Sequence, residues 1–77
     1  MNAYTYDQLT VGQSEQFTVT VTPAMLQRFA ADTGDGNPLH ADDAFARAQG
    51  YDGRVAYGLL TASFLSTLAG VYLPGKW

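Results

Sequence analysis

Hydrophobic and polar residues alternate along residues 14–21. Phe17, Val19 and Val21 fall on one side of an extended chain, because successive side chains of a strand point to opposite faces. The other side carries polar residues: Gln16, Thr18 and Thr20. This alternation predicts a strand with one buried face.

A helix is predicted directly after this strand. Thr22 is suited to cap it and Pro23 to occupy its first position, where a backbone N–H is not needed. Gly34 is placed to end the helix, since glycine readily adopts the left-handed conformation of a C-terminal cap. The residues that recur at helical spacing on one face are Leu26, Phe29, Ala30 and Thr33.

A second, short helix is predicted after residue 42. Asp42 can cap it, and Asp43 complements the helix dipole in the first turn. Phe45 and Ala48 are expected to face inward, and Gly50 to end the helix.

The last predicted helix runs from about Gly58 to Leu73 and is stopped by Pro74-Gly75. One side is bulky, with Leu60, Phe64, Leu68 and Val71, and another is small, with Gly58, Ala62, Ser66 and Ala69. Such a helix needs a large partner surface, which one strand does not supply. We therefore expect that a second polypeptide or another copy supplies the missing sheet, or that the chain is a fragment.

Composition narrows the class of protein. The chain has 77 residues, enough for one domain, and a formal net charge of -3 with only four scattered basic residues. This charge does not favour nucleic-acid binding. The absence of cysteine excludes a disulfide framework and fits a reducing compartment. The longest apolar-rich stretch is interrupted by polar residues and too short for a membrane span, and no signal peptide is recognised, so we expect a cytoplasmic location.

The segment Gly34–His40 carries the candidate chemistry. Its two glycines and its proline predict a non-repetitive loop. Asp35 and the only histidine of the chain, His40, lie on this loop. A carboxylate near an imidazole can orient the ring or share a water molecule with it. The alternative is structural: Asp35 forms a turn, which Asn37-Pro38 also favours, and His40 is a loop histidine with satisfied hydrogen bonds.

Other kinds of site have weaker support. The ligand spacing after Asp32 does not match a calcium loop, and one histidine without cysteine does not favour zinc, so we expect no metal. Gly58 opens the last helix, where a backbone N–H can receive an oxyanion, although a close-packing glycine is the alternative. Ser66 lies within an apolar helix, where serine usually bonds the preceding turn, and no nucleophile elbow is present.

Three stretches closely resemble the MaoC-like dehydratases, the (R)-specific enoyl-CoA hydratases of the hot-dog fold. They are FAADTGDGNPLHADDAFA at residues 29–46, VAYGLLTASFLS at residues 55–66 and GVYLPG at residues 70–75. The resemblance covers most of residues 14–75, and its loop motif is highly specific.

The resemblance implies an α+β hot-dog fold, in which an antiparallel sheet wraps a long central helix, and it implies dimers. The reaction implied is reversible addition of water to a trans-2-enoyl thioester of coenzyme A or a carrier protein, giving an (R)-3-hydroxyacyl thioester. It needs no metal and no redox cofactor. By position, Asp35 and His40 match the catalytic pair, and Gly58 matches the N–H that polarises the thioester carbonyl. Asn37 is expected to shape the loop, and Ser66 to support the pair.

Two departures from the family pattern stand out. The family usually has His-Gly where this chain has Tyr57-Gly58. Tyr57 is expected to support the site, with a ring larger than that of the family's histidine. Family members are also about twice as long, so residues 1–77 are expected to form a single truncated domain, the N-terminal half, without most of the wrapping strands. The leading hypothesis is a hydratase/dehydratase. The alternatives are a non-catalytic half that works only by assembling with itself or a partner chain, and a related thioester hydrolase.

Overall fold

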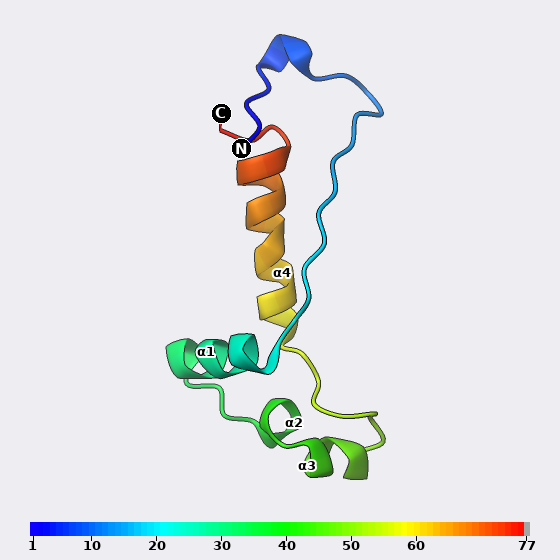
Figure 1. The fold of residues 1–77 in the computed structure, drawn as a ribbon, viewed down its shortest axis with the longest axis vertical. Helices are drawn as coiled ribbons and strands as arrows, with labels where there is room; N and C mark the ends of the chain where they lie inside the picture. Colours follow the sequence, from blue (N-terminus) through cyan, green and yellow to red (C-terminus); the bar gives the residue numbers. More distant parts are fainter. Residues whose placement is uncertain (77) are drawn as a thin grey trace. The chain divides into compact units, whose positions relative to one another are not determined.

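The computed structural model describes residues 1–76 and divides into two compact units. One unit contains Met1–Val19 and the described residues from Ala62 onward, and the other is the continuous stretch Thr20–Thr61. Helix α4 (Gly58–Thr67), which is labelled in Figure 1, contributes residues to both units.

The continuous unit begins with helix α1, which spans Pro23–Thr33. Its start is fixed by Thr22, whose Oγ1 accepts a hydrogen bond from the Met25 backbone N–H at 3.3 Å. Its end is fixed by Gly34, which has φ 78° and donates its N–H to the Ala30 carbonyl at 2.8 Å. Both predicted boundaries of this helix are confirmed, because each depends on bonds between near neighbours.

Helix α2 spans Pro38–Ala41 and corrects the prediction of a loop as far as His40. Asn37 caps it, since its Oδ1 accepts the Leu39 N–H at 2.9 Å. Proline is tolerated at the first position of a helix, so Pro38 starts this turn and does not break it. His40 therefore lies on a helical turn, whereas Asp35 lies on the preceding loop.

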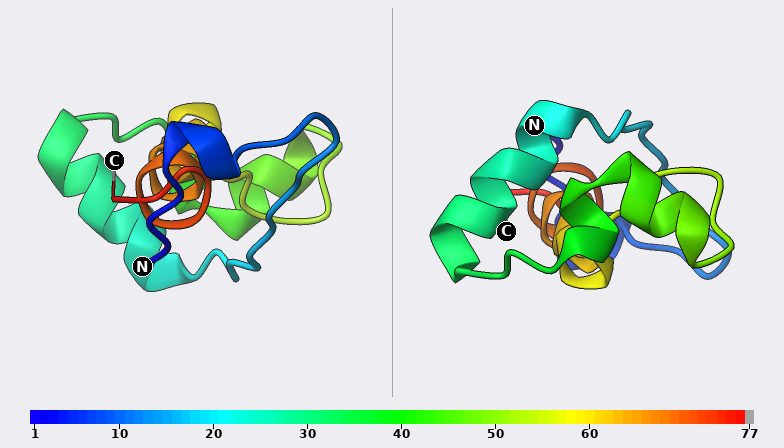
Figure 2. Two further views of the ribbon diagram at one scale, coloured as in Figure 1. Left: turned by 90° about the horizontal axis from the view of Figure 1, so that it is seen from above. Right: turned by 90° about the horizontal axis from the view of Figure 1, so that it is seen from below.

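Helix α3 (Asp43–Ala48) follows, and Figure 2 shows α1, α2 and α3 as the teal and green ribbons. The predicted cap is confirmed: Asp42 Oδ1 accepts the Phe45 N–H at 3.2 Å. The predicted inward face is wrong, because Ala46 is fully buried while Phe45 is 40% exposed and Ala48 is also exposed. The Ala46 carbonyl accepts the Tyr51 N–H, so the chain after the helix folds over Ala46.

Helix α4 continues into a π-helical segment, Leu68–Tyr72, so the predicted last helix is present with a widened final turn. The bulky residues predicted for one face are half-buried, and those predicted for the small face are exposed. Leu59 and Leu65 are also exposed, by 77% and 66%. No residue of α4 is fully buried.

In the other unit, the N-terminal segment lies along the residues that follow the π-helical segment. Ala3 and Gly75 form an isolated antiparallel bridge, and the Tyr4 N–H donates to the Pro74 carbonyl at 2.9 Å. The chain then forms a short 3-10 helix, Tyr6–Gln8. Phe17 stacks on Tyr72 with ring centroids 4.9 Å apart.

Residues 14–21 form no strand in the described structure, and Figure 1 draws them as a simple trace. The strand prediction is therefore wrong for this structure. A strand exists only when a neighbouring segment pairs with its N–H and C=O groups, and residues 1–76 place no such segment beside it. The helical part of the predicted α+β fold is present. None of the helices described over residues 1–76 is both long and apolar enough to cross a bilayer.

Candidate active site

His40 lies in the last turn of α2 and is half-buried. Its Nδ1 atom is 2.6 Å from the Val55 carbonyl oxygen. A carbonyl oxygen only accepts hydrogen bonds, so Nδ1 carries the proton in the neutral ring and Nε2 keeps its lone pair. The ring is thus arranged to act as a proton acceptor through Nε2.

Asp35 is held by an array of local bonds on the exposed loop between α1 and α2. Its backbone N–H donates to Thr33 Oγ1 at 3.2 Å, and its Oδ1 accepts the Asn37 N–H at 3.1 Å. This second bond is an Asx turn, in which an aspartate side chain replaces a backbone acceptor. Among the hydrogen bonds of the described residues, none uses the other carboxylate oxygen, so Oδ2 is available to a water molecule.

Tyr57 connects the two predicted catalytic residues. Its hydroxyl group donates to the Asp35 backbone carbonyl at 2.7 Å. Its ring lies against the His40 ring, with centroids 4.0 Å apart, and against the Phe29 ring at 4.5 Å. Tyr57 is only 3% exposed, so it forms the core beneath this site. The hydrogen bonds of the described residues include none between the side chains of Asp35 and His40.

Gly58 follows Tyr57 and is the first residue of α4. It is exposed, and a Cβ atom added there would have no neighbour within 4 Å. Close packing within this chain therefore does not explain the glycine. The first N–H groups of a helix have no acceptor within the helix, which suits Gly58 to receive a carbonyl oxygen. Ser66 is an exposed residue of α4, and its role in supporting the pair stays a prediction.

Arg54 is a contributor that the sequence did not reveal. Its Nε donates to the His40 backbone carbonyl at 2.8 Å, and its N–H donates to Asp43 Oδ1 at 2.9 Å. It therefore ties the end of α2 and the start of α3 to the loop before α4. A single arginine in a polar loop gives no pattern from which this role could be predicted.

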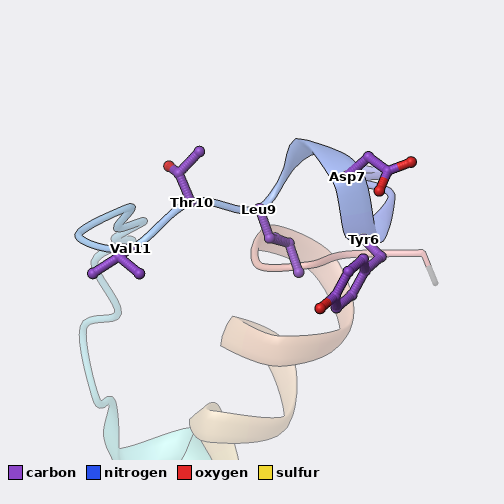
Figure 3. A pocket seen from close by; sticks show the side chains of 5 residues that line it. All are labelled: Tyr6, Asp7, Leu9, Thr10 and Val11. Carbon is purple, nitrogen blue, oxygen red and sulfur yellow. The ribbon is translucent and has the colours of Figure 1, made fainter.

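Neither Asp35 nor His40 lines any of three hollows on the surface of the described residues. One of these hollows, of about 460 Å³, is formed by residues at and after the 3-10 helix. Figure 3 shows these side chains: Tyr6, Asp7, Leu9, Thr10 and Val11. Tyr6 is 89% exposed, so this hollow is open and unlike an enclosed substrate pocket. Within residues 1–76, no three histidine, aspartate or glutamate side chains are grouped closely enough to hold a metal ion.

Comparison with known proteins identifies the family. The MaoC like domain family matches residues 7–72, which is most of the chain. The chain therefore belongs to the family of MaoC-like domains.

Named relatives agree with this family. The chain is 41% identical to the "(R)-specific enoyl-CoA hydratase" of Aeromonas caviae over 68 residues, which is 88% of this chain and 51% of the relative. It is 36% identical to the "3-hydroxybutyryl-CoA dehydratase" of Methylorubrum extorquens over 70 residues, 91% of this chain and 45% of that relative. The chain thus spans about half the length of these curated relatives. No solved structure matches it significantly.

Proposed function

We propose that this chain carries the acid–base site of a hydratase/dehydratase that acts on enoyl thioesters. The reaction is reversible addition of water to a trans-2-enoyl thioester, giving an (R)-3-hydroxyacyl thioester. The observation that carries this proposal is the bond from His40 Nδ1 to the Val55 carbonyl, which leaves Nε2 as a proton acceptor. Tyr57 contacts both His40 and Asp35. Family membership and the names of the relatives support it.

The chemistry requires a water molecule held by the carboxylate of Asp35 and Nε2 of His40. As the water oxygen bonds to the β-carbon, one of its protons passes to the pair. The electrons of the double bond move toward the thioester carbonyl, and a proton is then delivered to the α-carbon. Dehydration follows the same steps in reverse. Coenzyme A or a carrier enters only as part of the substrate.

Gly58 is proposed to stabilise negative charge on the substrate. Negative charge develops on the thioester oxygen while water adds, and a backbone N–H aimed at this oxygen stabilises it. The exposed N-terminus of α4, with no side chain at Gly58, allows a carbonyl group to approach closely.

The test is the loss of the enoyl absorbance of crotonyl-CoA when the protein is added. Asp35→Asn and His40→Ala are each expected to lower the rate by at least about 100-fold, the usual range for acid–base groups. Asp32→Asn is a matched control, because this exposed aspartate lies just before the loop. Activity that survives both site substitutions would overturn the assignment of the pair.

A thiol reagent distinguishes the rival thioester hydrolase. Hydrolysis releases free coenzyme A, whereas hydration leaves the thioester intact. We expect no thiol signal while the enoyl absorbance falls. A thiol signal that appears at the same rate would favour the hydrolase instead.

A second candidate is a half domain that works only in an assembly with another copy or a partner chain. The exposed Leu59 and Leu65 favour it, because a largely apolar helix needs a covering surface. The unpaired residues 14–21 favour it as well, and we place the chain in the N-terminal half of a hot-dog domain. Sedimentation is expected to show an assembly heavier than one chain or a loosely packed monomer. A compact, well-ordered monomer would contradict this candidate.

A further inference from the structure

We propose that Tyr57 is a positioning residue that sets the location of Asp35 and the orientation of His40. This inference rests on the proposed function, because it assigns a role at the same site. Tyr57 touches neither the water nor the thioester in this proposal. It acts through the two residues that do.

The hydroxyl group of Tyr57 positions Asp35. The loop residues around Asp35 are exposed, and their other side-chain bonds are made to close neighbours in the sequence. The bond from Tyr57 joins residues 22 positions apart and holds the Asp35 carbonyl at 2.7 Å. Tyr57 is only 3% exposed, so its side chain is largely shielded from competing water, and this bond constrains the loop.

The ring of Tyr57 orients His40. The bond from Nδ1 to Val55 by itself allows the imidazole to rotate about the hydrogen-bond direction. Tyr57 covers one face of the imidazole at 4.0 Å with an interplanar angle of 29°, which opposes that rotation. Phe29 in turn packs against Tyr57 at 4.5 Å, so the stack is supported from α1. Together these contacts fix the direction of the Nε2 lone pair.

The length of the side chain explains why tyrosine is needed at this position. The phenol carries its oxygen beyond the far edge of the ring, and an imidazole has no polar atom at that distance from the backbone. A histidine at position 57 could stack on His40 but could not reach the Asp35 carbonyl without movement of the backbone. The anchoring of the Asp35 loop in this chain therefore depends on the hydroxyl group of Tyr57.

Tyr57→Phe tests the hydroxyl group, with Tyr51→Phe as the matched control. Tyr51 is 51% exposed and belongs to the same unit, and none of the hydrogen bonds described for residues 1–76 uses its hydroxyl group. NMR supplies a readout that is independent of activity. The Gly36 amide nitrogen shares a peptide bond with the Asp35 carbonyl, and His40 is the only histidine, so its ring protons are assigned without ambiguity.

In Tyr57→Phe we expect the Gly36 nitrogen signal to shift and the His40 ring-proton signals to stay. In the hydration assay we expect kcat to fall about tenfold or more while KM stays within about twofold, as for loss of orientation without loss of binding. Tyr57→His should shift the Gly36 nitrogen in the same way. Tyr57→Leu should move the His40 ring-proton signals as well, because the stacked ring is gone. Tyr51→Phe should change none of these quantities.

The proposal is overturned if Tyr57→Phe keeps the wild-type Gly36 shift, or if it shifts that signal but keeps the wild-type kcat. The proposal is also overturned if Tyr57→Phe lowers kcat but has lost its far-UV circular dichroism signal, because Tyr57 would then act in folding. Failure of the proposed function looks different. In that case the wild-type protein does not hydrate crotonyl-CoA, and the Gly36 and His40 shifts alone decide whether Tyr57 holds the two residues in place.

Discussion

Replacing Gly34 with alanine should destabilise the protein, whereas the same replacement at Gly36 should not. Gly34 ends α1 with φ 78°, in the left-handed region that disfavours residues with a Cβ atom. Gly36 has no such positive φ. At both positions an added Cβ would meet nothing within 4 Å, so a steric clash contributes to neither result. The pair of variants therefore isolates the cost of the backbone conformation.

The expected change in the free energy of unfolding follows from two opposing effects. The left-handed conformation costs alanine about 1–2 kcal/mol. Alanine also restricts the unfolded chain, which stabilises the folded state by about 0.4–1 kcal/mol. Gly34→Ala should therefore lower the free energy of unfolding by roughly 0.5–1 kcal/mol, and Gly36→Ala should raise it by about 0.4–1 kcal/mol. The two variants should differ by about 1–2 kcal/mol.

Urea unfolding followed by far-UV circular dichroism measures this difference. The slopes against urea should agree among the three proteins, so that the midpoints report stability. Gly34→Ala should also slow crotonyl-CoA hydration, since Asp35 follows the strained residue directly. Midpoints that shift equally in both variants would refute the argument that Gly34 needs its left-handed conformation.

Three further predictions concern the cap of α2, the first residue of α4 and the tyrosine that is hydrogen-bonded to Glu15. Asn37→Ala should lower the free energy of unfolding, measured with urea, by about 1 kcal/mol because α2 loses its cap. Asn37→Asp should retain most of the wild-type stability, because aspartate can also cap the helix. Gly58→Ala should leave the free energy of unfolding unchanged or higher, because the added Cβ atom has room. The same variant should slow hydration by about tenfold or more, because the added methyl group hinders the approach of a carbonyl to the N–H of this residue. An unaffected hydration rate would exclude that approach. The hydrogen bond to Glu15 and the negative charge of Glu15 raise the pKa of Tyr4 above its ordinary value near 10. The contribution of this bond to the stability of the fold is therefore complete below about pH 10 and is lost as pH rises further. Unfolding curves on either side of pH 10 should show a smaller loss in Tyr4→Phe, and an equal loss would contradict the linkage.

Local signals explain what the sequence predicted correctly. Thr22 and Gly34 bound α1, and Asp42 caps α3, as their residue types indicate. Each of these features depends on a bond to a residue only a few positions away. The start of α4 at Gly58 was also predicted, and the family was recognised from the residues around Asp35 and His40.

The failures have physical reasons. Pro38 was interpreted as a helix breaker, although Asn37 before it is a cap and proline fits the first helical turn. The alternation at residues 14–21 describes which side chains a strand would bury, but it does not supply a pairing segment. The sequence identified Tyr57 only as a departure from the family pattern. Its bond to Asp35 joins residues 22 positions apart, and no periodic pattern reports such a contact.

The separations along the chain have a consequence for synthesis. The bond between His40 and Val55 spans 15 residues and that between Tyr57 and Asp35 spans 22, and both lie within the continuous stretch Thr20–Thr61. Short loops cost little entropy to close, and contacts of this range form quickly. The constellation around His40 can therefore close on the ribosome once Gly58 has emerged, before the later turns of α4 are available. None of the residues that make these two bonds lies beyond Thr61.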